Sequence, residues 1–119
     1  MSTRTGGYSG SGAIVRRATA SLLGLAVGDA LGATTEFMNP EDIREKYGVH
    51  DRIRGGGWLN LPPGSVTDDT EMARCVARAI LGKGGWDLTA IAEEFARWLA
   101  GNPVDVGATC RRGIRDYME

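Results

Sequence analysis

The acidic run Thr67 to Glu71 (Thr-Asp-Asp-Thr-Glu) brings three carboxylates and two hydroxyls together in five residues. Mg2+ and Mn2+ prefer such hard oxygen donors, so the run is a candidate metal site. It also fits the start of a helix, because Asp68 followed by Glu71 is a capping-box pattern and acidic first-turn residues suit the helix dipole. Taken alone the spacing favours capping, but one segment can serve both purposes.

Three further acidic residues fall near the expected ends of helices. Asp29 and Glu36 follow the first helical segment, and Asp105 precedes the last one. Each has an ordinary structural explanation: Asp29 as a turn residue, Glu36 as a solvated charge and Asp105 as a helix N-cap. Together with the acidic run, however, they form a set of carboxylates at helix ends, where helical proteins often display functional groups.

Composition argues against several classes of function. The 119 residues carry a net charge of −1, which gives no electrostatic support for binding nucleic acid or an acidic membrane surface. A nucleic-acid interface would have to rely on Arg111, Arg112 and Arg115, which are more simply a solvated helix face. One histidine and two distant cysteines cannot supply a His/Cys zinc site or a His-based catalytic triad.

Hydrophobic spacing predicts an all-α protein. Apolar residues recur at helical intervals, and no convincing strand pattern or internal repeat is present. The expected helices cover residues 13–33, 41–47, 70–81, a segment capped by Asp87 or Thr89 and ended by 101–103, and 107–117. Cys75 and Cys110 fall on apolar-patterned helices, so we expect both to be buried, reduced thiols rather than a disulfide.

The first helix is apolar nearly all round, which predicts burial on several sides. Gly24, Gly28 and Gly32 recur every four residues and would let another backbone approach one face. Because a few short helices cannot cover such a helix, we expect residues 13–119 to be the N-terminal part of a longer single domain. The composition of residues 1–12, which is rich in Gly, Ser and Thr, predicts a disordered leader.

A twin-arginine export signal is a competing interpretation of the N-terminal region. Arg16-Arg17 precedes the apolar stretch 18–27, but that stretch runs directly into Asp29 without a convincing cleavage site. It is also too short to span a membrane. We therefore expect a cytoplasmic protein without membrane insertion.

Two long motifs resemble those of the ADP-ribosylglycohydrolases. Residues 24–33 (GLAVGDALGA), followed by Glu36-Phe37, are similar to the family's opening motif, and residues 63–72 (PGSVTDDTEM) are similar to its second signature. Residues 104–107 (VDVG) fall at the expected place after them. The resemblance extends over residues 18–119.

One branch of the family is most similar. The glycine loop at 55–58 (GGGW) and the segment 103–117 (PVDVGATCRRGIRDY) resemble the bacterial members that remove ADP-ribose from an arginine of the nitrogenase iron protein. The resemblance thus implies an ADP-ribosylated protein as substrate. Other family members cleave ADP-ribose from serine or from small acetylated forms, so the choice of arginine remains an expectation.

The resemblance implies a compact all-α fold with two Mg2+ or Mn2+ ions in a cleft. Thr67, Asp68 and Asp69 would be metal ligands, and Glu36 and Asp69 the candidate catalytic carboxylates. Cleavage of the N-glycosidic bond builds oxocarbenium character that carboxylates stabilise. The two ions would fix the ribose hydroxyls and activate water.

The resemblance also implies contacts with the substrate. Asp105 would contact the ADP-ribose, while Gly107, Gly56 and Gly57 would let backbone N–H groups approach its phosphates. Ala108 stands where relatives often carry Asn, so one substrate hydrogen bond is expected to be missing.

The absence of a second acidic cluster is the main departure from the family pattern. Relatives carry their remaining metal ligands in an Asp-x-Asp-Thr/Ser cluster near the C-terminus of much longer chains, and this sequence contains no such cluster. We therefore expect half a metal site and negligible activity from these residues alone. The alternative is a non-catalytic ADP-ribose-binding or adaptor protein.

Overall fold

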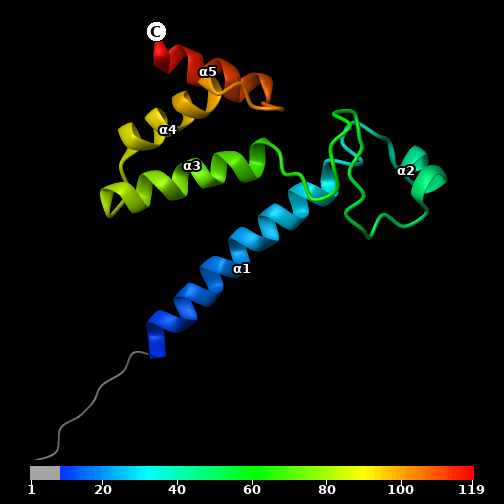
Figure 1. Cartoon of the computed structure of the whole chain (residues 1–119), viewed down its shortest axis with the longest axis horizontal. Coiled ribbons are helices and arrows are strands. Elements are labelled where there is room, and N and C mark those ends of the chain that lie inside the picture. The colour runs from blue at the N-terminus through cyan, green and yellow to red at the C-terminus, as the bar shows by residue number, and fades with distance from the viewer. Residues whose placement is uncertain (1–8) are drawn as a thin grey trace, which may run out of the picture.

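The computed structural model describes residues 9–119 and confirms an all-α fold (Figure 1). The helices are α1 (Ser9–Gly32), α2 (Pro40–Tyr47), α3 (Asp68–Lys83), α4 (Leu88–Ala100) and α5 (Ala108–Met118). Within residues 9–119 the β pairing is limited to an isolated antiparallel bridge between Gly56 and Leu61. None of the helices in this range is long and apolar enough to cross a membrane.

The N-terminal helix begins earlier than the sequence predicts. Residues 9–12 belong to α1 instead of a disordered leader, while residues 1–8 of that leader lie outside the described residues. Residues 9–12 contain no proline, so the helix can extend through them despite the low helix propensity of glycine. The prediction that the helix begins only after residue 12 is therefore wrong for residues 9–12.

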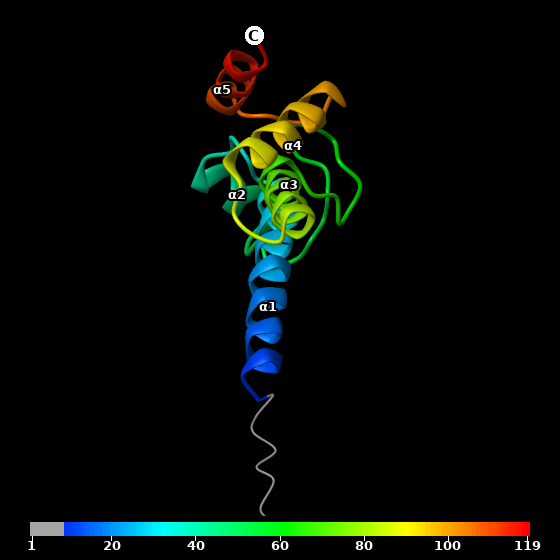
Figure 2. The ribbon, with the colours of Figure 1, turned by 90° about the vertical axis from the view of Figure 1, so that its left-hand side faces the viewer.

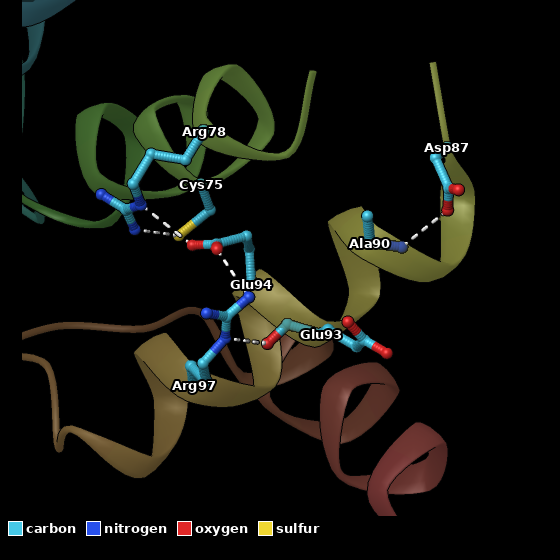
Figure 3. Close-up of polar contacts among 7 residues, drawn as sticks. All are labelled: Cys75, Arg78, Asp87, Ala90, Glu93, Glu94 and Arg97. Atoms are coloured by element: carbon cyan, nitrogen blue, oxygen red, sulfur yellow. Dashed lines mark hydrogen bonds and ion pairs between the residues drawn. The ribbon is translucent and has the colours of Figure 1, made fainter. Parts of the chain in front are cut away.

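Caps define the two C-terminal helices. Asp87 caps α4, because its carboxylate accepts the N–H of Ala90 at 2.8 Å (Figure 3). Thr89 lies inside that helix. Gly107 occupies the N-cap position of α5, so the interpretation of Asp105 as its N-cap is wrong.

The core lies where α3, α4 and α5 pack in succession, with α4 between the other two (Figures 1 and 2). Ala79 of α3 and the α4 residues Ala90 and Ile91 are its buried centre, and Val76 and Phe95 pack against them. Small side chains at 79 and 90 let the two helices approach closely. This interface fixes α3, whose first turn carries the acidic run.

A polar cluster borders the same α3–α4 interface (Figure 3). Glu94 forms ion pairs with Arg78 at 2.9 Å and with Arg97 at 2.6 Å, and Arg78 Nη2 donates to Cys75 Sγ at 3.2 Å. Cys75 is buried, and this burial raises the pKa of its thiol. Cys110 is exposed, so the expectation that both free cysteines are buried is wrong for Cys110. It lines an open pocket between α5 and the helices α3 and α4, together with Met72 and Phe95.

Most of α1 projects away from the other helices (Figure 2). Among the helices, α1 contacts only α3, and apolar residues such as Ile14 and Leu23 are 68% and 60% exposed. The glycine face is open too, since no heavy atom lies within 4 Å of a Cβ placed at Gly24, Gly28 or Gly32. The expected burial of α1 on several sides is therefore not found among residues 9–119. The radius of gyration is 19.1 Å, against about 13.5 Å for a compact domain of this length.

The segment between α1 and α3 folds back beside the C-terminal end of α1 (Figure 1). Its helix α2 packs against none of the four other described helices, so loop contacts hold it in place. His50 Nε2 forms a hydrogen bond with the carbonyl oxygen of Leu31 at 2.8 Å. This bond ties the loop after α2 to α1.

Candidate active site

Asp29, near the end of α1, ties that helix to the start of α3. Its carboxylate accepts the backbone N–H and the hydroxyl of Thr67 at 2.9 and 2.5 Å, and those of Thr70 at 3.1 and 2.5 Å. Burial, the largest single influence, raises the pKa of Asp29, but the four hydrogen bonds together outweigh it and hold the pKa below its usual value. Asp29 is thus an ionised, buried tether rather than a turn residue.

The acidic run is not used for helix capping. Thr67 occupies the N-cap position of α3, but its side chain bonds to Asp29 instead of capping the helix. Glu71 accepts the indole N–H of Trp98 at 2.5 Å, so it is not the reciprocal member of a capping box. The capping-box prediction for Asp68 and Glu71 is therefore wrong. Asp68 accepts the backbone N–H of Gly107 at 3.1 Å, which brings the start of α5 to the acidic run.

A cleft of about 440 Å³ opens between the last turns of α1 and the first turn of α3. Its lining comprises Gly24, Leu25, Gly28, Asp29, Gly32, Ala33, Thr35, Glu36, Thr67, Asp68 and Asp69. The predicted ligands Thr67, Asp68 and Asp69 and the predicted catalytic Glu36 thus share one cleft. The open glycine face of α1 forms part of its wall.

Asp69 lies among other carboxylates. Partial desolvation of this largely exposed side chain raises the pKa of Asp69, and the negative charges of Asp68, Asp29 and Asp105 raise it further. Asp105 lies two residues before Gly107, whose N–H bonds to Asp68, although Asp105 does not line the cleft. The site is therefore a concentration of negative charge.

The glycine loop packs against the segment after α1 without lining the cleft. Gly56 and Gly57 are not among the lining residues. Gly57 has φ +69°, and a Cβ at this position would meet the carbonyl oxygen of Ala33 at only 2.2 Å. Gly56 exchanges two backbone hydrogen bonds with Leu61, at 2.7 and 2.9 Å. Close packing of backbone against backbone explains the glycine at position 57.

Sequence reasoning missed the contact between Trp58 and Glu36. The indole Nε1 of Trp58 donates to Glu36 Oε2 at 3.0 Å. The rings of Trp58 and Phe37 form an edge-to-face pair with centroids 5.4 Å apart. The one signal in the sequence is an aromatic residue directly after three glycines, a run that allows close approach to another loop.

The donor chemistry fits a hard divalent cation, although the described residues supply few charged ligands. Within residues 9–119 no group of three or more His, Cys, Asp or Glu side chains is arranged to hold a metal ion. As possible ligands, Asp68 and Asp69 offer two carboxylates, and Thr67 offers a hydroxyl. Because that hydroxyl donates its proton to Asp29, its lone pairs remain available to a cation.

Comparison with known proteins agrees with the motifs. The profile of the ADP-ribosylglycohydrolase family matches residues 11–119. The ADP-ribosyl-[dinitrogen reductase] glycohydrolase of Rhodospirillum rubrum is 59% identical over 102 residues, which cover 86% of this chain and 35% of that protein. The ADP-ribosylarginine hydrolase Tri1 of Serratia proteamaculans is 38% identical over 110 residues, 87% of this chain and 29% of that protein.

A further relative belongs to the same group of hydrolases. The Tri1 protein of Pseudomonas putida is 36% identical over 109 residues, which cover 86% of this chain and 28% of that protein. The chain thus spans about a third of the length of the curated relatives it matches. The family profile covers nearly all of the described residues, and the chain belongs to the ADP-ribosylglycohydrolase family.

Proposed function

We propose that this chain contributes part of the active site of a metal-dependent hydrolase that removes ADP-ribose from an arginine side chain of a protein. The observation that carries the proposal is the Asp29 tether. It holds Thr67 and the first turn of α3 against α1, so that Asp68 and Asp69 share a cleft with Glu36. Membership of the family supplies the reaction class.

Thr67, Asp68 and Asp69 would hold Mg2+ or Mn2+ in this cleft. Their donors are all oxygens, which both cations prefer. The mutual repulsion of Asp68, Asp69, Asp29 and Asp105 is the electrostatic environment that a divalent cation would relieve. When bound, such ions would fix the ribose hydroxyls and acidify the attacking water.

The carboxylates of the cleft can carry the remaining chemistry. Breaking the bond between the ribose anomeric carbon and the guanidine nitrogen builds positive charge on the ribose ring, which nearby carboxylates stabilise. Asp69 and Glu36 are our candidates for deprotonating water and for protonating the leaving guanidine. The position of both carboxylates in the cleft lining puts them within reach of a bound substrate.

Arginine is the proposed acceptor residue because of the relatives' names. Tri1 is an ADP-ribosylarginine hydrolase, and the Rhodospirillum protein acts on dinitrogen reductase. The higher identity to the Rhodospirillum protein favours an ADP-ribosylated nitrogenase iron protein as the target of this chain. Asp105 and Gly107, next to the acidic run, are the proposed contacts to ADP-ribose, and Gly56 and Gly57 remain more distant candidates.

A chimera tests the proposal. The 102 matching residues of the Rhodospirillum relative would be replaced by those of this chain, and release of ADP-ribose from ADP-ribosyl-arginine would be measured with Mn2+. We expect activity, and we expect Asp68→Ala or Asp69→Ala to reduce both turnover and Mn2+ binding measured by electron paramagnetic resonance. Asp116→Ala, on an exposed part of α5, is the matched control and should change neither.

Two results would contradict the proposal. Full activity and full Mn2+ binding in both acidic variants would remove the metal assignment. A folded chimera that binds ADP-ribose without releasing it would favour the alternative, a non-catalytic ADP-ribose-binding or adaptor protein. The small number of carboxylate ligands among residues 9–119 is the observation behind that alternative. The 119-residue chain assayed alone should show negligible turnover.

A further inference from the structure

Two large aromatic side chains stand exposed beside Glu36, a residue of the cleft lining. Phe37 is 80% exposed and Trp58 is 54% exposed, and their rings pack edge to face at an interplanar angle of 67°. Both adjoin Glu36, which lines the cleft: Phe37 follows it in sequence and Trp58 is hydrogen-bonded to it. Phe37 also has φ +62°, a conformation that non-glycine residues rarely adopt and that often marks functional sites.

The aromatic pair is held in position by its surroundings. Trp58 Nε1 donates to Glu36 Oε2 at 3.0 Å, which leaves Oε1 without a protein hydrogen bond within residues 9–119. The preceding Gly57 packs directly on the backbone of Ala33. The loop that carries Trp58 is therefore fixed against the loop that carries Glu36 and Phe37. Fixed ring faces and one free carboxylate oxygen make a preorganised binding surface.

The charge of the cleft selects the kind of group that this surface would receive. Four lining residues are acidic, namely Asp29, Glu36, Asp68 and Asp69, and no Lys, Arg or His is among the lining residues. A planar guanidinium can stack on an aromatic face and donate to a carboxylate at the same time. A purine could stack on the same rings, but it carries no positive charge to pair with Glu36 and the acidic lining.

We propose that Glu36, Phe37 and Trp58 form the subsite that receives the guanidinium group of the ADP-ribosylated arginine. This inference rests on the proposed function, because it names the part of the cleft that recognises the leaving side chain. The aromatic faces would hold the cation, and Glu36 Oε1 would accept its N–H groups. Arginine would be favoured over serine, whose side chain offers neither charge nor a plane to stack.

The test uses the 119-residue chain and follows the indole N–H signals of its three tryptophans by NMR. The probe is an arginine with blocked termini, and the matched control ligand is the citrulline equivalent, which has the same shape without charge. We expect the arginine probe to shift the Trp58 signal saturably and the citrulline probe to leave it unchanged. Trp98, which donates to Glu71, and Trp86, which is 69% exposed, report non-specific effects.

Variants separate the parts of the subsite. Trp58→Phe keeps a ring but removes the donor to Glu36, Glu36→Gln removes the charge, and Phe37→Asn removes a ring while tolerating positive φ. With Glu36→Gln and Phe37→Asn we expect about tenfold weaker binding of the arginine probe, read from the Trp58 signal. Trp58→Phe is expected to weaken binding less, read from the amide signals of Glu36 and Phe37. Trp86→Phe is the matched control and should bind like wild type.

Several outcomes would overturn the subsite. Equal shifts with the arginine and citrulline probes would show that the subsite does not recognise the positive charge. Shifts with adenosine, but not with arginine, would show that the rings bind a purine instead. Unchanged affinity in Glu36→Gln, with the Trp98 signal of the folded chain intact, would remove Glu36 from recognition. This binding readout needs neither metal nor turnover, so an inactive chimera would count against the proposed function and not against the subsite.

Discussion

The carboxylate of Asp29 accepts two hydrogen bonds from Thr67, one from the backbone N–H at 2.9 Å and one from the hydroxyl at 2.5 Å. This pair joins the last turns of α1 to the residue that precedes α3. The backbone bond sets where the chain enters α3, and the side-chain bond sets the direction of the Thr67 hydroxyl. The arrangement of the acidic run therefore depends on a residue 38 positions away in the sequence.

Asp29→Asn should weaken this connection strongly. An amide has one acceptor oxygen and carries a donor where the second oxygen stood, so some of the four buried donors of Thr67 and Thr70 lose their partner. We expect the free energy of unfolding at pH 7 to fall by about 3 kcal/mol, measured by urea denaturation. The exposed control Asp116→Asn should change it by less than about 0.5 kcal/mol. Equal effects of the two variants would contradict the tether.

The contribution of Asp29 should also depend on pH. A carboxyl group whose pKa is lower in the folded protein adds stability above its unfolded pKa of about 3.9, and that stability is lost as the pH falls through the lower folded pKa. The difference in unfolding free energy between wild type and Asp29→Asn should stay constant from neutral pH to about pH 5 and shrink below about pH 4. Urea denaturation at a series of pH values measures it, and a difference that grows on acidification would contradict the assignment.

Asp69 should have the opposite effect on stability. Burial and the charges of Asp68, Asp29 and Asp105 raise its pKa, so its ionised form destabilises the folded chain at neutral pH, and this penalty is relieved as the pH falls through the raised pKa. In the presence of a chelator, Asp69→Asn should therefore stabilise the chain. The gain should be less than about 1 kcal/mol, because solvent screens this exposed group.

Added Mn2+ extends the measurement on Asp69. If the residue is a ligand as proposed, Mn2+ should raise the melting temperature of wild type more than that of Asp69→Asn. Asp116→Asn should respond to Mn2+ like wild type. A chelated Asp69→Asn that is less stable than wild type would show that the carboxylate is not repelled by its neighbours.

Local patterns made the helices predictable. The spacing of Val76 and Ala79, and of Ile91 and Phe95, depends only on the helical repeat, so it can be read along the chain. The candidate ligands could be proposed from the sequence because they are contiguous: Thr67, Asp68 and Asp69 form one motif. The structure then places them in the same cleft as Glu36.

Contacts between distant segments could not be read in this way. Trp58 and Glu36 are 22 positions apart, and nothing in either segment identifies the other as its partner. The burial of α1 is not a local property either: Leu22 and Leu23 are apolar and stay exposed among residues 9–119, because burial depends on which elements pack on them. Capping-box spacing likewise failed at Asp68, because Asp29 and Gly107 offered other partners to the residues involved.

The glycine loop offers a matched pair of substitutions. Gly56 and Gly57 have similar φ values, +76° and +69°, but a Cβ at Gly56 has no neighbour within 4 Å, whereas one at Gly57 would lie 2.2 Å from the Ala33 oxygen. Gly56→Ala should cost about 1 kcal/mol of unfolding free energy from its backbone conformation alone. Gly57→Ala should cost about 2 kcal/mol more because the loop must move. Equal costs in urea denaturation would show that the Gly57–Ala33 contact is not tight.

Glu94 is expected to stabilise the α3–α4 interface through its ion pair with Arg78 of α3, while its second ion pair, with Arg97, lies within α4 (Figure 3). Its side chain is 14% exposed and bridges Arg78 and Arg97, so Glu94→Gln leaves two like charges facing each other across the interface. Because both arginines are substantially exposed, solvent limits the loss of unfolding free energy to about 1 kcal/mol, and 1 M NaCl should reduce it further.

Glu93→Gln is the control for Glu94→Gln. Glu93 is exposed and contacts Arg97 only through its backbone carbonyl, at 3.4 Å, so the substitution leaves that contact in place. Its unfolding free energy should stay within about 0.5 kcal/mol of wild type. A salt-independent loss in Glu94→Gln would mean that packing of the side chain, and not its charge, joins the two helices. Thermal unfolding at low and high salt distinguishes the two, because only the ion pairs are screened.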